Sequence, residues 1–466
     1  MERDVVVAPR PARGHIVMLV DNGIRGDSRV QKSARSAADA GWDVTLLGCS
    51  PATGDGAART RSWRLGRAEA RLLPLAGTRS SRTGRRASGI RARLVAHGGS
   101  PLRVARFVRR PVEHAQVWFW RAVNGDRAWR RLEPGLWNYE RTFGPVIDDL
   151  APDVIHAHDF RMLGVGARAA QRARAAGRAV SLVWDAHEFL PGVKPWRDNA
   201  RWLPAHRAYE REYAPCADAV VTVSDTLADL LQREHGLPRR PTVVLNAPDV
   251  DRRGAVTSNP TADLRRQCGI DADQPLLVYA GSASVQRGLE TVVRALPRLP
   301  GVHVALVVAD PSAAYPRQLS AAASRLGAGD RLHVLPYVPY DEVVAFLSAA
   351  DVGVIPIHHW PNHELALITK FFEYSHARLP IVVSDVKTMA ETVRATGQGE
   401  VFPARDVAGF VRAVESVLAD PRRYRAAYDK PDSPLSTWTW RAQAETLDSI
   451  YRRLKTDEAS IKGTLP

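Results

Sequence analysis

The sequence predicts an α/β protein with two domains, each built on a parallel β-sheet. Short apolar runs of strand length alternate with amphipathic helical segments, which is typical of strands joined by crossover helices. The alternation begins at residue 15, is interrupted by a polar stretch, 251–274, that contains glycine and proline, and resumes at residue 275. We interpret residues 251–274 as a linker that forms the hinge between the domains. A chain of 466 residues, 45% of them hydrophobic, can bury two full cores.

The cysteines and the apolar runs exclude several classes of protein. The three cysteines, Cys49, Cys216 and Cys268, form no CxxC pair, which excludes a disulfide framework and a cysteine zinc site and fits a reducing compartment. No apolar stretch has the length of a signal-peptide core or of a transmembrane helix. We therefore expect a cytoplasmic protein that is soluble or bound at the inner face of the membrane.

The N-terminal domain is expected to span residues 15–250. His15–Val20 is an apolar run of strand length, and the loop DNGIRG leads from it into a helix that Asp27 or Ser28 can cap. A second strand, Trp42–Leu47, completes a βαβ unit. The loop lacks the GxGxxG fingerprint, so it gives no support to a nicotinamide cofactor.

A basic and aromatic insertion is expected at residues 51–145. Residues 51–150 hold 20 arginines, no lysine and 8 acidic residues, so they carry +12 of the net charge of +15. The run VEHAQVWFWRAVNGDRAWRRLEPGLW sets tryptophans among arginines, which suits an anionic membrane surface or a lipid-linked acceptor. The same pattern is explained equally well if the insertion is a loop and two helices packed on the sheet, with arginines that are simply solvated. Nucleic acid is less favoured, because charge runs are usually solvated surface.

Histidines cluster near the ends of two later strands in this domain. The strand at 154–157 carries His156 within HAHD, and the strand at 180–184 leads into His187 within DAHE. Neither stretch has the spacing of a zinc motif such as HExxH, so we expect no metal. We interpret His156 as a buried structural histidine.

The second domain is expected to span residues 275–435, beginning with the buried strand Leu276–Gly281. An amphipathic helix, 436–455, follows it. We expect the N-terminus, 1–14, to be disordered and residues 456–466 to be a tail.

The stretch HELALITKFFEYSHARLPIVVSD, residues 363–385, contains the main candidate site. A polar loop leads into a helix beside a parallel strand, and such a helix start attracts an anion such as a diphosphate through its N–H groups and its dipole. Lys370 would add positive charge, and Glu373 could bind two vicinal hydroxyl groups. A lysine and a glutamate three residues apart are also a common solvated ion pair, so both interpretations stay open.

This stretch resembles the PNKLFEYMAAGLPVV signature of the bacterial retaining glycosyltransferases of family 4. The segments DNGIRGDSRV, PDVIHAHD, DAHE and SASVQRG resemble other elements of that family in the same order. The family has the GT-B fold, in which two Rossmann-like domains face each other across a cleft. The resemblance implies an acceptor-binding N-terminal domain, a nucleotide-sugar-binding C-terminal domain, and a last helix, 436–455, that crosses back to the N-terminal domain.

The resemblance implies roles for residues of the main candidate site. Glu373 matches the glutamate that holds the donor ribose. Glu364, Thr369 and Lys370, in the loop and at the helix start, are expected to contact the nucleotide sugar. Eight residues separate Glu364 from Glu373, where the family has seven, so Leu365 is the strictly matching position.

Other candidate residues lie in three further segments. In SASVQRG, Arg287 falls on the lysine and Ser282 on the arginine with which the family neutralises the donor diphosphate. His187 matches a histidine near the transferred sugar, and the backbone of Gly23 is expected to face the diphosphate or the acceptor.

The resemblance thus predicts a retaining, metal-independent, hexosyl-type glycosyltransferase that needs no cofactor besides its nucleotide-sugar donor. His187, Arg287 and Lys370 are the expected catalytic residues. The acceptor would be an intermediate of envelope lipid or polysaccharide synthesis, or a secondary metabolite. The alternatives are a nucleotide-sugar epimerase of the same fold and a non-catalytic basic binding protein.

Overall fold

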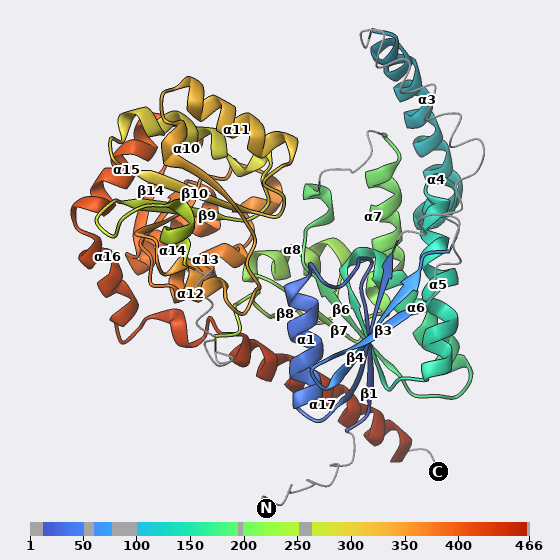
Figure 1. The fold of residues 1–466 in the computed structure, drawn as a ribbon. Coiled ribbons are helices and arrows are strands. Elements are labelled where there is room, and N and C mark those ends of the chain that lie inside the picture. Colours follow the sequence, from blue (N-terminus) through green and yellow to red (C-terminus); the bar gives the residue numbers. More distant parts are fainter. Residues whose placement is uncertain (1–12, 51–59, 77–99, 194–198, 251–262, 464–466) are drawn as a thin grey trace, which may run out of the picture. The chain divides into compact units, whose positions relative to one another are not determined.

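The computed structural model describes residues 13–50, 60–76, 100–193, 199–250 and 263–463. The chain divides into two compact units (Figure 1). The first unit comprises Met1–Val243 with Thr446–Pro466, and the second comprises Val244–Glu445. Both are α/β structures, so the predicted fold class is confirmed. Almost all of the N-terminus that we expected to be disordered lies outside the described residues.

An eight-stranded sheet forms the centre of the first unit, in the order β3-β4-β2-β1-β5-β6-β7-β8. Every neighbouring pair is parallel except β3 and β4. Its central strands are buried along their length, as expected of a sheet covered on both faces. The strands are β1 (His15–Leu19), β2 (Asp43–Ser50), β3 (Arg61–Leu65), β4 (Ala68–Pro74), β5 (Val154–His158), β6 (Ser181–Ala186), β7 (Ala219–Thr222) and β8 (Thr242–Val243).

The helices of the first unit connect these strands (Figure 1). In the first of them, Asp27 accepts a hydrogen bond from the Val30 N–H and so caps the helix, and the predicted apolar face, which includes Val30 and Ala34, is buried. The helices are α1 (Ser28–Asp39), α3 (Ser100–Asn124), α4 (Trp129–Leu132), α5 (Trp137–Leu150), α6 (Asp159–Ala175), α7 (Trp202–Tyr213) and α8 (Asp225–His235).

The basic and aromatic insertion contains both buried and exposed parts. Strands β3 and β4 extend the sheet, and Trp129 is fully buried with its ring centroid 4.8 Å from that of Tyr209. On α3, in contrast, Trp118 is 74% exposed and Phe119 is 50% exposed. Packing on the domain therefore accounts for α4 and for the start of α5, but leaves an exposed aromatic segment on α3. Residues 51–59 and 77–99 of the insertion lie outside the described residues.

A six-stranded parallel sheet forms the second unit, in the order β11-β10-β9-β12-β13-β14. Alternate side chains of β9 enter two separate core clusters, with Leu277 in one and Val278 in the other, because side chains alternate across a strand. The strands are β9 (Leu276–Ala280), β10 (His303–Val308), β11 (Leu332–Pro336), β12 (Val352–Ile355), β13 (Ile381–Ser384) and β14 (Gly399–Phe402). The helices are α9 (Leu264–Cys268), α10 (Leu289–Ala295), α11 (Ala314–Arg325), α12 (Val343–Leu347), α13 (Thr369–His376), α14 (Lys387–Thr396), α15 (Val407–Ala419) and α16 (Pro421–Ala426).

The stretch expected to be a linker, 251–274, contains helix α9. Asp263 caps it by accepting hydrogen bonds from two backbone N–H groups, and Leu264 and Cys268, four residues apart, are buried in the second core. Two apolar positions were too few to show as a helical pattern among the surrounding polar residues. The chain passes from the first unit to the second between Val243 and Val244, whereas we expected the N-terminal domain to end at residue 250.

The last helix, α17 (Trp440–Gly463), starts later and ends later than the predicted helix 436–455. It therefore includes most of the stretch that we interpreted as a tail. From Thr446 onward it belongs to the first unit, where Asp448 accepts a hydrogen bond from the Trp42 indole at 2.8 Å. Across the described ranges, no helix is both long enough and apolar enough to span a bilayer.

Candidate functional site

The first group of candidate residues gathers at the carboxyl ends of β5 and β6. These strands are parallel, and their register places His158 beside Asp185. His187 follows β6 directly. The carboxyl edge of an open α/β sheet is where ligands of this fold class bind, so the predicted His187 lies at the favourable edge.

Asp185 is the centre of a buried hydrogen-bond network. Its two oxygens accept hydrogen bonds from the Arg29 guanidinium at 3.0 and 2.9 Å, and the two side chains are only 2% and 3% exposed. His158 Nδ1 lies 3.1 Å and His187 Nε2 lies 2.8 Å from the same carboxylate. Burial raises the pKa of Asp185, but Arg29 and His187 outweigh it and hold that pKa well below its ordinary value. Asp185 is therefore a carboxylate at neutral pH.

His187 lies between two carboxylates. Its Nε2 faces Asp185, and its Nδ1 lies 3.4 Å from Asp159 Oδ1. Burial and the charge of Arg29, whose Nε lies 3.0 Å from His187 Nε2, lower the pKa of His187, but the two carboxylates outweigh both effects and raise it to about 9. Its side chain is 17% exposed, so a charged imidazolium reaches the surface here. Asp159 has a φ of 63°, a left-handed conformation that costs energy in residues other than glycine and is often found at functional sites.

His156 is fully buried, as we predicted for a structural histidine. Its Nδ1 lies 2.7 Å from the Tyr451 hydroxyl on α17, whereas its Nε2 has no hydrogen-bond partner among the described residues. Ligand atoms of His156, His158 and Asp185 lie within 4.8 Å of one another, close enough to surround a metal ion. Arg29, however, occupies both oxygens of Asp185, and a dication there would lie next to a buried guanidinium. The geometry therefore fits an ion-pair network better than a metal site.

The loop that contains Gly23 lies between β1 and α1. Asn22 organises it: its Oδ1 accepts a hydrogen bond from the Ile24 N–H at 2.8 Å, and its Nδ2 donates one to Asp27 at 3.0 Å. Gly23 is exposed, and a Cβ added to it would meet no atom within 4 Å. Its backbone is open to a ligand, but no steric demand within the described structure explains the glycine.

In the second unit, Arg287 ends a short turn between β9 and α10. The next residue, Gly288, has a φ of 69°, and a Cβ there would lie 1.8 Å from the carbonyl oxygen of Pro356, so only glycine fits. Arg287 is half-buried, and its guanidinium has no hydrogen bond or ion pair within the part of the chain that the structure describes. The pKa of Tyr337 is raised by burial, lowered by Arg287 and raised by Glu373. Tyr337 therefore lies within the electrostatic reach of both Arg287 and Glu373.

The start of α13 carries three of the predicted ligands. Glu373 is 6% exposed, and its Oε2 accepts a hydrogen bond from Lys370 at 3.0 Å. Thr369 accepts one from the Asn246 amide at 2.9 Å, and the residue before it, Ile368, provides no side-chain cap. The intrahelical ion pair that we considered is thus present, but its carboxylate is buried rather than solvated. A buried carboxylate beside a lysine that is 24% exposed is unusual for a purely structural surface pair.

Ser282 and Glu364 have different surroundings from the other candidates. Ser282 is exposed, and its carbonyl accepts a hydrogen bond from the Tyr279 hydroxyl at 2.8 Å. Glu364 uses both carboxylate oxygens within the protein: one lies 2.7 Å from His359 Nδ1, and the other accepts a hydrogen bond from the Lys387 N–H at 2.7 Å. Glu364 therefore stabilises the start of α14, and its contact with a nucleotide sugar stays a prediction.

The sequence did not reveal four residues of the network around His187: Arg29, Asp159, Asp185 and Tyr451. Arg29 did leave a signal, because it lies four residues before Ser33 and eight before Ala37, on the face that α1 buries. An arginine at such a position must pair with a buried acid. The partner could not be identified, because Asp185 follows Arg29 by 156 residues.

Comparisons with known proteins identify relatives of both halves of the chain. Residues 83–252 match the family model described as Glycosyltransferase Family 4, and residues 260–430 match the one described as Glycosyl transferases group 1. The chain is 28% identical to glycogen synthase of Mycobacterium tuberculosis over 68% of this chain and 72% of that protein. It is 29% identical to D-inositol 3-phosphate glycosyltransferase of Geodermatophilus obscurus over 67% and 70%.

Solved structures with a similar fold cover nearly the whole chain. Sucrose-phosphate synthase from Thermosynechococcus elongatus matches with a TM-score of 0.68 and 17% identity, over 96% of this chain and 100% of that one. Anabaena HepE, in complex with UDP and glucose, matches with a TM-score of 0.62 and 14% identity, over 94% and 100%. At these identities the likeness concerns the fold.

Proposed function

This chain belongs to the family 4 glycosyltransferases of the GT-B fold, and we propose that it transfers a sugar from a nucleotide-diphosphate sugar to an acceptor hydroxyl with retention of anomeric configuration. The observation that supports this proposal most directly is the buried carboxylate of Glu373 at the start of α13. Arg287, whose guanidinium has no partner in the described structure, acts on the pKa of Tyr337, as Glu373 does. A carboxylate for hydroxyl groups and a free guanidinium for phosphates are what a nucleotide diphosphate requires.

We assign donor binding to the second unit. Glu373 accepts hydrogen bonds from the two ribose hydroxyls, and Lys370 turns from Glu373 toward a phosphate oxygen. Arg287 can bind two phosphate oxygens at once because its guanidinium is planar and carries several N–H donors. The N–H groups at the start of α13 add a favourable dipole. Because solved structures of the structurally similar HepE contain UDP or UDP-glucose, UDP is the first nucleotide and UDP-glucose the first sugar donor to test.

We assign contact with the transferred sugar to His187 in the first unit. The carboxylates of Asp185 and Asp159 hold its ring by both nitrogens and raise its pKa. A positive group fixed in this way does not need to reorient as negative charge develops on the leaving diphosphate, which lowers the barrier.

The proposed reaction proceeds on one face of the sugar. The bond between the anomeric carbon and the diphosphate oxygen breaks, and the acceptor oxygen forms a new bond on the same face. The departing phosphate oxygen takes the acceptor proton, so no protein base is required. Arg287 and Lys370 stabilise the leaving diphosphate, and for this reason we propose a reaction that is independent of metal.

Substitution of Glu373 tests the proposal. We expect Glu373→Ala to abolish the thermal stabilisation by UDP and to lower turnover of UDP-glucose, because the ribose loses its carboxylate partner. Glu391→Ala, at an exposed position on α14, is the matched control and should leave both unchanged. Unchanged nucleotide affinity and turnover in Glu373→Ala would refute the assignment. Isomerisation of the donor sugar without an acceptor would identify an epimerase instead.

A second proposal concerns the exposed aromatic segment of α3. Val112, Phe119 and Val123 recur at intervals that place them on one helix face, Trp118 is adjacent, and all four are at least 50% exposed. We propose that this face, within a strongly basic segment, contacts an anionic membrane surface.

Vesicle binding tests this second proposal. We expect the protein to sediment with phosphatidylglycerol vesicles and not with phosphatidylcholine vesicles, and Trp118→Ala with Phe119→Ala to abolish sedimentation. Trp360→Ala, which removes an exposed tryptophan of the second unit, is the control. Equal sedimentation of the double variant would refute membrane contact. Oligonucleotide binding that falls steeply with salt would indicate nucleic acid instead.

A further inference from the structure

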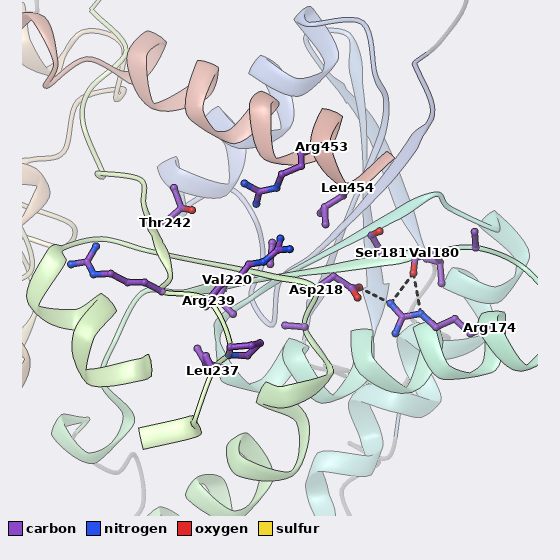
Figure 2. A pocket seen from close by; sticks show the side chains of 15 residues that line it. Arg174, Val180, Ser181, Asp218, Val220, Leu237, Arg239, Thr242, Arg453 and Leu454 are labelled. Carbon is purple, nitrogen blue, oxygen red and sulfur yellow. Dashed lines mark hydrogen bonds and ion pairs between the residues drawn. The ribbon is translucent and has the colours of Figure 1, made fainter. Parts of the chain in front are cut away.

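The first unit contains a cavity of about 720 Å³ at the edge of the sheet opposite to His187. The residues that begin β6 and β8, Ser181 and Thr242, line it, whereas His187 follows the carboxyl end of β6. Figure 2 shows Arg453 and Leu454 of α17 on one side of the cavity and Leu237 on the other. This volume lies within the range of roughly 300–1,000 Å³ that is usual for small-molecule sites.

The walls of the cavity are largely apolar. Four buried core residues line it, each at most 9% exposed: Val180, Val220, Leu237 and Leu454. Such walls favour a ligand that carries an apolar body, because its transfer from water is stabilising.

The charged residues of the lining are four arginines and one aspartate, Asp218. Two of the arginines have partners in the protein. Arg174 donates to Asp218 at 2.5 Å and to the Val180 carbonyl at 2.8 Å, as drawn in Figure 2. Arg240 donates to Asp229 at 2.6 Å and to Asp225 at 3.0 Å.

The guanidinium groups of the other two arginines, Arg239 and Arg453, form no hydrogen bond or ion pair in the described part of the chain. The neighbours of Arg453 on α17 differ from it in this respect, since Arg452 pairs with Asp448 and Lys455 pairs with Asp153. The cavity thus keeps two positive charges that the protein does not neutralise.

We propose that this cavity is a second binding site, separate from the proposed donor site, for a small phosphate monoester with an apolar body. Two uncompensated guanidinium groups match the charge of close to −2 that a phosphate monoester carries at neutral pH. Guanidinium groups also bind phosphate oxygens in pairs, which adds geometric selectivity. The apolar walls accommodate the remainder of the ligand.

Calorimetric titration of the full chain, in the presence of saturating UDP, tests the proposal. Hexyl phosphate carries both features of the ligand, inorganic phosphate only the charge, and hexanol only the apolar body. We expect hexyl phosphate to bind at least roughly tenfold more tightly than either, because the two contributions add within one site. UDP occupies the proposed donor site, so this result does not depend on whether the proposed function is correct.

Arginine variants locate the site. Arg453→Ala and Arg239→Ala should each weaken hexyl phosphate binding by roughly tenfold, as loss of a charged hydrogen-bond donor predicts. Arg233→Ala, an exposed arginine of α8 that does not line the cavity, should leave it unchanged. All three positions are exposed, so the variants are expected to fold, and circular dichroism melting checks this.

Either of two results would overturn the proposal: hexanol binding as tightly as hexyl phosphate, or wild-type affinity for hexyl phosphate in the double variant Arg239→Ala, Arg453→Ala. Dihexanoyl phosphatidic acid identifies the source of the ligand. If it binds at the same arginines more tightly than hexyl phosphate, the site takes a lipid phosphate, and if more weakly, a soluble phosphate ester.

Discussion

Replacement of Asp185 by asparagine removes one charge of a buried ion pair and leaves the shape of the side chain almost unchanged. The guanidinium of Arg29, which is 3% exposed, then loses its ion pair with Asp185. Loss of one partner of a buried pair costs about 3–5 kcal/mol, because the remaining charge is neither solvated nor paired. At about 1.4 kcal/mol per factor of ten, this cost increases the open population of the first unit by roughly 140-fold to 4,000-fold.

Hydrogen exchange measures this effect in the first unit alone. Amides of β5 and β6 should exchange faster in Asp185→Asn by that factor, whereas amides of β9 and β10 in the second unit should be unchanged. Asp148→Asn is the matched control, because its pair with Arg172 has a similar length, 2.9 Å, but both side chains are 40% exposed. An exposed pair contributes about 0–1 kcal/mol. Equal acceleration in the two variants would refute the role that we give to the buried pair.

Further predictions concern pH, one turn and one hydroxyl. The pKa of His187 is raised to about 9, so its charge stabilises the first unit fully below the ordinary value of about 6.5, and this contribution is lost as the pH rises through 9. Protection of the β6 amides against hydrogen exchange should therefore decline as the pH rises from about 6.5 to 9, and His187→Gln should remove this decline. Gly288→Ala should destabilise the second unit by more than the roughly 1–3 kcal/mol of a strained φ and should weaken UDP binding, because its Cβ would meet a carbonyl oxygen at 1.8 Å. Gly301→Ala, with a φ of 74° and no atom within 4 Å, should cost only the strain and leave UDP binding unchanged, as denaturant unfolding and calorimetry can check. Tyr451→Phe should cost about 1–3 kcal/mol in chemical denaturation, since it leaves a buried histidine without its partner. The buried Tyr315 hydroxyl has no partner among the described residues, so Tyr315→Phe should be close to neutral.

Local patterns in the sequence were sufficient for the two-domain fold and for many elements. The buried run His15–Val20 and the apolar face of α1 required only periodicity and a capping residue, both of which are contained in a few neighbouring positions. The same holds for the start of α13, where Lys370 and Glu373 are three residues apart.

Features that depend on distant residues were not predictable in this way. Asp185 and Arg29 are 156 positions apart, and Tyr451 and His156 are 295 positions apart, so no local pattern joins them. The cavity opposite His187 depends on the starts of three strands and on one turn of α17. Helix α9 was not predicted for a different reason: its short apolar face lies within a polar stretch of sequence.

The first unit is complete only when the segment from Thr446 onward joins residues that lie before Val244. During synthesis on the ribosome, residues 13–243 emerge before Asp448 and Tyr451, so the nascent first unit lacks the partner of Trp42 and the hydroxyl beside His156 until those two residues have been made. The second unit is formed by one uninterrupted segment of the chain, so it can fold before the first unit is complete. A prematurely terminated polypeptide would therefore expose the surface that α17 normally covers, and we expect such fragments to require chaperones or to be degraded.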